Sequence, residues 1–109
     1  MDKYRLLRER LLQCEFSSEC EFLLPPAATN EQLGLVHTDD YIHAIESGAL
    51  TDLQVRRIGF PWSEKMVERS RRSTGASIAA ARAAMDDGIS ANLAGGTHHA
   101  FPDLSLIHI

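Results

Sequence analysis

The sequence has no long apolar run and very few cysteines. No apolar stretch approaches the roughly 20 residues that a helix needs to cross a bilayer. The first residues, Met1 to Arg5, lack the apolar core of a signal peptide, so we expect a cytoplasmic protein that does not bind a membrane. Cys14 and Cys20 are the two cysteines of the chain. They cannot complete a four-cysteine metal site, so we expect reduced, buried thiols rather than a disulfide or a zinc site.

A strong excess of one charge is also absent. Eleven Lys and Arg residues against 15 Asp and Glu residues give a formal net charge of −4. This balance gives no general reason to expect a nucleic acid or an anionic membrane as a partner. The length of 109 residues suits one small domain or a piece of a larger one.

Apolar periodicity and capping residues predict four helices. They cover residues 3–13, 30–36, 39–47 and 63–87. Thr29 or Asn30 is the expected cap of the second helix, Thr38 caps the third and Gly48 ends it, and Gly88 ends the fourth. The intervening residues 50–60 show no clear period and are expected to form a linker.

The longest predicted helix, over residues 63–87, has a narrow stripe of small side chains that suits close packing against another element. Its four arginines lie mostly off that stripe, and we expect them to be solvated. They are Arg69, Arg71, Arg72 and Arg82.

Two short segments have the pattern of strands. Residues 20–24 are largely apolar and are followed by Pro25 and Pro26, and Ile89, Ala91 and Leu93 alternate with polar residues. The order helix, strand, Gly-Gly, His-His fits an α/β domain whose site lies at the carboxyl ends of parallel strands. We therefore predict an α/β fold with a parallel sheet.

The adjacent histidines His98 and His99 follow Gly95 and Gly96, and they are the strongest candidates for chemistry. Imidazole is the side chain whose unperturbed pKa lies closest to neutrality. Side chains of adjacent residues diverge in an extended segment, so the pair is better suited to two different roles than to gripping one metal. One imidazole could act as a general base on water, while the other is held charged or acts as an acid. On spacing alone, a polar surface loop is an equally good interpretation.

The motif Ala94-Gly95-Gly96-Thr97-His98-His99-Ala100 resembles the tandem-histidine motif of the histone deacetylase superfamily, and particularly its bacterial, acetoin-utilisation-like members. Two further segments support this resemblance. They are Leu35-Val36-His37-Thr38-Asp39-Asp40-Tyr41-Ile42 and Gly59-Phe60-Pro61-Trp62. The resemblance covers residues 1 to about 103.

The resemblance implies an arginase/deacetylase-type three-layer fold with an eight-stranded parallel sheet, and a zinc-dependent amidohydrolase that removes acetyl groups from N-acetylated lysine or polyamine substrates. His98 would pair with a buried aspartate and act electrostatically. His99 would be the general base that activates the zinc-bound water. Gly96 would approach the substrate channel, and Phe101 would help to shape it.

The sequence departs from the family in one respect. The family's zinc ligands come from an Asp-x-His segment and a further Asp beyond the tandem histidines, followed by a catalytic tyrosine, and this sequence has none of these. Zn²⁺ is therefore expected only in a full-length parent, with no metal ligand in this chain. We expect residues 1–103 to be the N-terminal portion of a deacetylase-like domain, residues 104–109 to be a non-native tail, and the chain as written to be inactive.

Two alternatives stay open at this point. In the first, the chain is a non-catalytic helical interaction or regulatory domain, and the histidine pair is incidental. In the second, the chain is a small metal-binding module that uses His98, His99 and His108. The sequence does not distinguish an acetylated protein from a small acetylated amine as the substrate, nor does it fix the oligomeric state.

Overall fold

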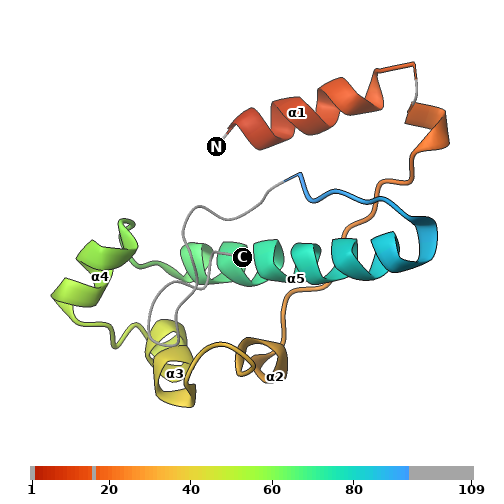
Figure 1. Ribbon diagram of the computed structural model, residues 1–109. Coiled ribbons are helices and arrows are strands. Elements are labelled where there is room, and N and C mark those ends of the chain that lie inside the picture. Colours follow the sequence, from red (N-terminus) through yellow and green to blue (C-terminus); the bar gives the residue numbers. More distant parts are fainter. Residues whose placement is uncertain (1, 16, 94–109) are drawn as a thin grey trace.

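A computed structural model describes residues 2–15 and 17–93 of the chain, and their regular structure is helical (Figure 1). The elements are α1 (Asp2–Leu12), a 3-10 turn (Ser17–Glu19), α2 (Asn30–Leu33), α3 (Asp39–Ser47), α4 (Asp52–Ile58) and α5 (Glu64–Asp87). None of the helices among these residues combines the length and the apolar character that crossing a membrane requires.

The predicted α/β fold with a parallel sheet is wrong for this part of the chain, because residues 2–15 and 17–93 contain no strand. Both segments with a strand pattern are irregular, and several of their apolar side chains face solvent. Leu24 is 92% exposed and Ile89 is 85% exposed. A strand is stable when a neighbouring strand satisfies its backbone groups and another layer covers its apolar face. Neither condition is met here. Residues 20–24 lead into the segment that crosses α5, and residues 89–93 run along α5.

Local capping sets the ends of the helices. It confirms the predicted carboxyl ends of α3 and α5, whereas the helix predicted over residues 30–36 is shorter, because α2 ends at Leu33 with Gly34 as its cap. The side-chain oxygen of Thr38 accepts from the backbone N–H of Tyr41 at 3.2 Å, and that of Ser63 accepts from Met66 at 3.0 Å. Gly48 and Gly88 end α3 and α5 with φ of 75° and 88°, a left-handed conformation that glycine adopts without strain.

Helix α4 corrects the prediction of a linker over residues 50–60. Thr51 and Gln54 form a reciprocal capping box in which each side chain bonds the other's backbone N–H, at 3.2 and 2.9 Å. Ile58 is buried at the end of this helix. The same device starts α2, where Thr29 and Gln32 form the second capping box. The threonine followed three residues later by glutamine was the signal for α4.

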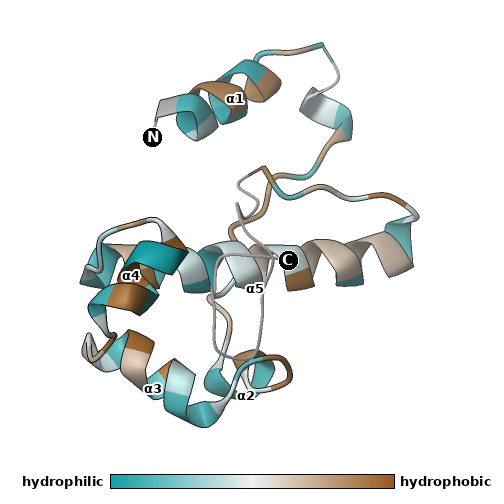
Figure 2. Ribbon diagram, turned by 60° about the vertical axis from the view of Figure 1, so that its left-hand side comes forward, coloured by the Kyte–Doolittle hydropathy of each residue, from teal (hydrophilic) through white to brown (hydrophobic). Residues whose placement is uncertain are grey.

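Helix α5 runs through the middle of the described structure. Helices α2 and α3 lie on one side of it, and α1 lies on the other side (Figures 1 and 2). The core lies between α5 and the layer of α2 to α4. Its buried members are Ala28, Leu33, Tyr41, Ile42, Ile45 and Ile58. Val67 and Ile78 pack against this core from α5.

The indole of Trp62 closes the carboxyl end of α3. Its Nε1–H donates to the backbone oxygen of Ile45 at 2.7 Å, which satisfies a carbonyl at the last turn of the helix. A Cβ on Gly48 would lie 3.2 Å from the indole Cζ2 atom, so the ring covers this glycine closely. The segment of residues 59–62 thus anchors its tryptophan against α3.

The segment before α2 crosses α5 in direct contact with the helix backbone at Gly75. A Cβ on Gly75 would stand 2.1 Å from the oxygen of Pro26 and 2.8 Å from the nitrogen of Ala28. The N–H of Ala28 donates to the backbone oxygen of Arg71 at 2.9 Å. Two chain segments more than 40 residues apart therefore meet at a position where only a glycine fits.

Arg71 fixes the same crossing with its side chain. Its guanidinium donates to the oxygen of Ala28 at 3.0 Å and to the Oδ1 atom of Asn30 at 2.5 Å, and it forms an ion pair with Glu46. Its side chain is only 13% exposed. The expectation that this arginine is solvated is wrong. It holds for the neighbouring Arg72, which is 51% exposed and pairs with Glu68 on the helix surface.

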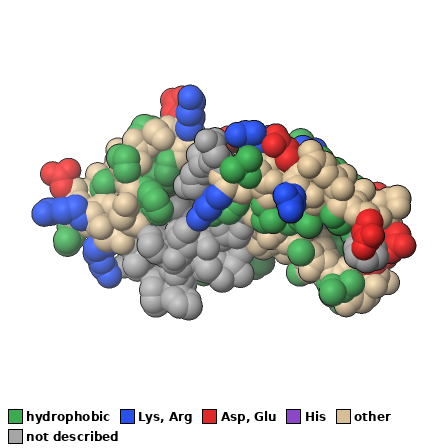
Figure 3. Space-filling view, turned by 90° about the horizontal axis from the view of Figure 1, so that it is seen from above, with side chains coloured by type: hydrophobic (Ala, Val, Ile, Leu, Met, Phe, Trp, Pro, Cys, Tyr) green, Lys and Arg blue, Asp and Glu red, His purple; other side chains and the backbone are tan. Residues whose placement is uncertain are grey.

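Helix α1 is covered less completely than the other helices. The guanidinium of Arg69 lies 5.5 Å from the ring centre of Tyr4, which joins α5 to α1 by a cation–π contact. Leu6 and Leu7 nevertheless remain 54% and 43% exposed. Hydrophobic side chains likewise reach the surface at several places on the face drawn in Figure 3. Cys14 and Cys20 are free, as predicted, but both are exposed rather than buried.

Replacing Gly75 by alanine tests the crossing. Alanine in a helix ordinarily stabilises by about 1 kcal/mol relative to glycine. Here the added methyl group would overlap backbone atoms, and we expect Gly75→Ala to lower the free energy of unfolding by about 2 kcal/mol in urea titrations followed by circular dichroism. The control Ala83→Gly, on the same helix, should cost about 1 kcal/mol through helix propensity. A Gly75→Ala protein more stable than the wild type would disprove the close approach.

The two neighbouring arginines form a second test. Lysine keeps the charge but cannot reach three acceptors with one planar group, so we expect Arg71→Lys to lower the free energy of unfolding by about 1–2 kcal/mol. Arg72→Lys changes an exposed pair and should stay within about 0.5 kcal/mol of the wild type. Equal effects of the two substitutions in the same urea titrations would contradict the role given to Arg71.

Candidate functional site

The predicted catalytic pair His98 and His99 lies outside the described residues, as do Gly96, Phe101 and His108. The roles assigned to them stay predictions. The structure does describe how the chain approaches them, because α5 and residues 88–93 lead directly into the Gly-Gly-Thr-His-His motif. The site is therefore built from the helix toward the motif.

Gly88 turns the chain back at the end of α5. Its φ of 88° and ψ of −26° are left-handed, and its N–H donates to the oxygen of Ala84 at 2.8 Å. Beyond it, residues 89–93 run back along α5 on the side that faces α1 (Figures 1 and 2). The chain thus approaches the motif from the middle of α5 rather than from its carboxyl end.

Asn92 ties this returning segment to α5. Its Nδ2 atom donates to the backbone oxygen of Ser73 at 3.2 Å and to the Oγ atom of Ser77 at 2.9 Å. The two serines are one helical turn apart, so one amide group reaches both. The strand pattern had Ile89 on the apolar side of an alternating segment and Asn92 on the polar side. The structure has Asn92 partly buried and Ile89 85% exposed.

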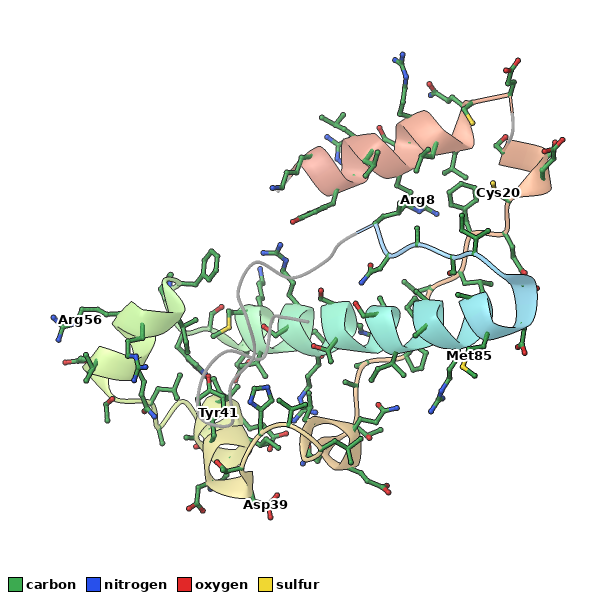
Figure 4. The ribbon with its side chains drawn as sticks, in the orientation of Figure 1. Arg8, Cys20, Asp39, Tyr41, Arg56 and Met85 are labelled. Carbon is green, nitrogen blue, oxygen red and sulfur yellow. The ribbon has the colours of Figure 1, made fainter. Side chains whose placement is uncertain are left out.

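The second motif segment contributes a buried aromatic pair. His37 is 6% exposed and Tyr41 is 3% exposed, and their ring centres are 5.4 Å apart with the planes tilted by 35°. Tyr41 lies between α3 and α5, while Asp39 points outward at the start of α3 (Figure 4). Within the described residues this segment therefore builds the core beneath α5.

A depression on α4 is lined by Asp52, Val55 and Arg56. It is shallow and open to solvent, and the Nε atom of Arg56 donates to the backbone oxygen of Asp52 at 3.4 Å. Arg56 lies at one end of the molecule, and Met85, on the last turns of α5, lies at the other (Figure 4). A site that does not exclude water gives little strength to electrostatic catalysis, so we assign no chemistry to this depression.

Residues 2–15 and 17–93 contain no group of three or more His, Cys, Asp or Glu side chains that could hold a metal ion. Zinc has three or four protein ligands in catalytic and structural sites. The described residues therefore do not fit a zinc centre, and no ligand is assigned among them.

Sequence reasoning missed two residues that shape the approach to the motif. Asn92 carries no signal in a single sequence, because its partners Ser73 and Ser77 lie 15 and more positions away. Gly75 looked like one more member of the small-residue stripe, and its importance depends on where residues 26–28 pass.

Comparison with known proteins gives two matches. The model of the histone deacetylase domain family matches residues 1–105. An uncharacterized protein of Picosynechococcus sp. is 41% identical over 102 residues, which make up 94% of this chain and 34% of that protein. The chain thus spans about a third of the length of the curated relative that it matches.

Proposed function

Because this chain belongs to the histone deacetylase domain family, we propose that it supplies the tandem-histidine segment of an amidohydrolase that removes acetyl groups from N-acetylated amines. One observation carries the proposal. The family match extends over residues 1–105 and so includes His98 and His99, the residues to which the resemblance of the motif assigns proton chemistry.

The proposed reaction divides two tasks between the neighbouring imidazoles. A ring nitrogen of His99 takes a proton from water, and the water oxygen forms a bond to the acetyl carbonyl carbon. The C–N bond then breaks, the amine nitrogen takes up the proton that His99 accepted from water, and acetate leaves. His98, held charged by a carboxylate, stabilises the negative charge that develops on the carbonyl oxygen. An imidazole suits the base because its ordinary pKa lies near neutral pH.

We propose that the whole domain depends on zinc, and we assign no zinc ligand to this chain. The described residues offer no set of ligands for the ion, and none of the steps above is assigned to it. The relative is about three times as long as the matched segment, so hydrolysis is proposed for a domain of that length.

The proposed substrates are an acetylated lysine side chain or an acetylated polyamine. Each carries an acetylated amine at the end of a slender aliphatic chain, which suits a narrow channel. Gly96 would allow the substrate to pass close to the backbone, and Phe101 would form part of the channel wall. Testing both substrate classes side by side decides between them.

An exchange experiment tests the function. The 102 matched residues of the Picosynechococcus protein are replaced by those of this chain, and release of acetate from an acetyl-lysine peptide and from N-acetylspermidine is measured. We expect the chimera to hydrolyse one of these substrates. His99→Ala in the chimera should lower kcat by about 10²- to 10⁴-fold, because a general base contributes a factor of that size.

Zinc content and a second histidine serve as controls. The chimera's zinc content should not change on His99→Ala, since His99 is proposed as a base and not as a ligand. His43→Ala, at an exposed position of α3, should retain the rate. Stoichiometric loss of zinc on His99→Ala would refute the assigned role. A chimera that folds but hydrolyses neither substrate would reject the function and favour a non-catalytic interaction domain.

A further inference from the structure

We propose that Asn92 is a positioning residue for the tandem histidines: its side-chain amide holds the returning segment against the middle of α5 and so fixes the point from which residues 94–99 begin. The inference rests on the proposed function for the role of His98 and His99. Its evidence, however, comes entirely from residues that the structure describes, residues 73–93 and the crossing segment 26–28.

The contact is a double hydrogen bond between an amide and a helix surface. The Nδ2 atom of Asn92 carries two hydrogens, and it meets two acceptors, the oxygen of Ser73 at 3.2 Å and the Oγ atom of Ser77 at 2.9 Å. Ser73 is 8% exposed. A donor that reaches a buried backbone carbonyl holds its own backbone close to the helix axis.

The side chains of residues 89–91 cannot supply this anchor. Ile89 is 85% exposed, and Ser90 and Ala91 are exposed as well. Apolar burial therefore contributes little to the path of residues 89–91. Asn92 and the next residue, Leu93, are the ones that approach α5 closely enough to be partly buried.

The anchor reduces the number of residues between the nearest fixed point of the described structure and the histidines. An extended chain covers at most about 3.5 Å per residue. Measured from Gly88, where α5 ends, His98 is ten residues away and could lie anywhere within roughly 35 Å. Measured from Asn92, it is six residues away, and its reach falls to roughly 20 Å. The positions of catalytic groups must be fixed to well under 1 Å. An anchor closer to the histidines narrows the range of positions that they can occupy.

The opposite face of α5 makes this anchor rigid. Successive residues of a helix are 100° apart, so Gly75 lies 200° from both Ser73 and Ser77. Residues 26–28 press on the Gly75 face, where a Cβ would stand 2.1 Å from the oxygen of Pro26. The helix is thus held from one side by the crossing segment and carries Asn92 on the other. A displacement of α5 would be transmitted to the start of the motif.

The test follows the ring resonances of the histidines in the 109-residue chain by nuclear magnetic resonance, over a pH titration. Asn92→Ala removes both hydrogen bonds. Ser77→Ala removes the hydroxyl acceptor alone, and Ser77→Thr restores it. Ser90→Ala, an exposed position two residues before Asn92, is the matched control. Histidine substitutions assign the resonances.

We expect Asn92→Ala and Ser77→Ala to shift the ring resonances of His98 and His99 while those of His43, on the surface of α3, stay in place. Ser77→Thr should return them to the wild-type positions, and Ser90→Ala should leave them unchanged. Unchanged His98 and His99 resonances in Asn92→Ala and Ser77→Ala would overturn the proposal. So would shifts of equal size at His43, because the substitutions would then act on the whole fold.

This readout does not depend on hydrolysis. If the chimera hydrolyses neither substrate while the ring resonances of His98 and His99 still respond to Asn92→Ala, the proposed function alone is rejected. If hydrolysis is found and the resonances do not respond, the positioning role alone is rejected.

Discussion

The close crossing of residues 26–28 over α5 is the constraint on which the rest of the described structure depends. It joins the backbone of the chain before α2 to the backbone of α5 at Gly75, where a single methyl group would overlap Pro26 and Ala28. Arg71 holds the crossing from the same helix face through Ala28, Asn30 and Glu46. Ala28 is one of the buried core residues, so the layer of α2 to α4 is seated on α5 by this contact.

From this crossing, the described structure extends in two directions along α5. On one side, the core is completed by Tyr41, Ile45 and Ile58, and Trp62 closes the end of α3. On the other side, Gly88 reverses the chain and Asn92 returns it to the helix at Ser73 and Ser77. Helix α5 is therefore a scaffold that ties the motif segment of residues 35–42 to the start of the tandem-histidine motif.

The sequence predicts the parts of this structure that depend on neighbours in the chain. Thr38, Ser63, Gly48 and Gly88 cap their helices through bonds that span three or four residues, and the caps at Thr38, Gly48 and Gly88 were predicted correctly. The parts that depend on distant partners were not predictable. A strand pattern at residues 89–93 forms a strand only beside another strand, and in the described residues Asn92 meets a helix instead. The role of Arg71 likewise needs acceptors 25 to 43 positions away. The candidate site was found through its motif, and the family match supports that identification.

Amide hydrogen exchange at Ala28 tests the central claim most directly. The N–H of Ala28 lies in an irregular segment, where exchange is ordinarily fast, yet here it donates to the oxygen of Arg71 at 2.9 Å in a buried position. The account predicts that this amide is protected as strongly as the central amides of α5, because both open only when the crossing is lost. Exchange of Ala28 as fast as that of the exposed neighbours Leu23 and Leu24 would contradict the claim that the crossing holds the structure together.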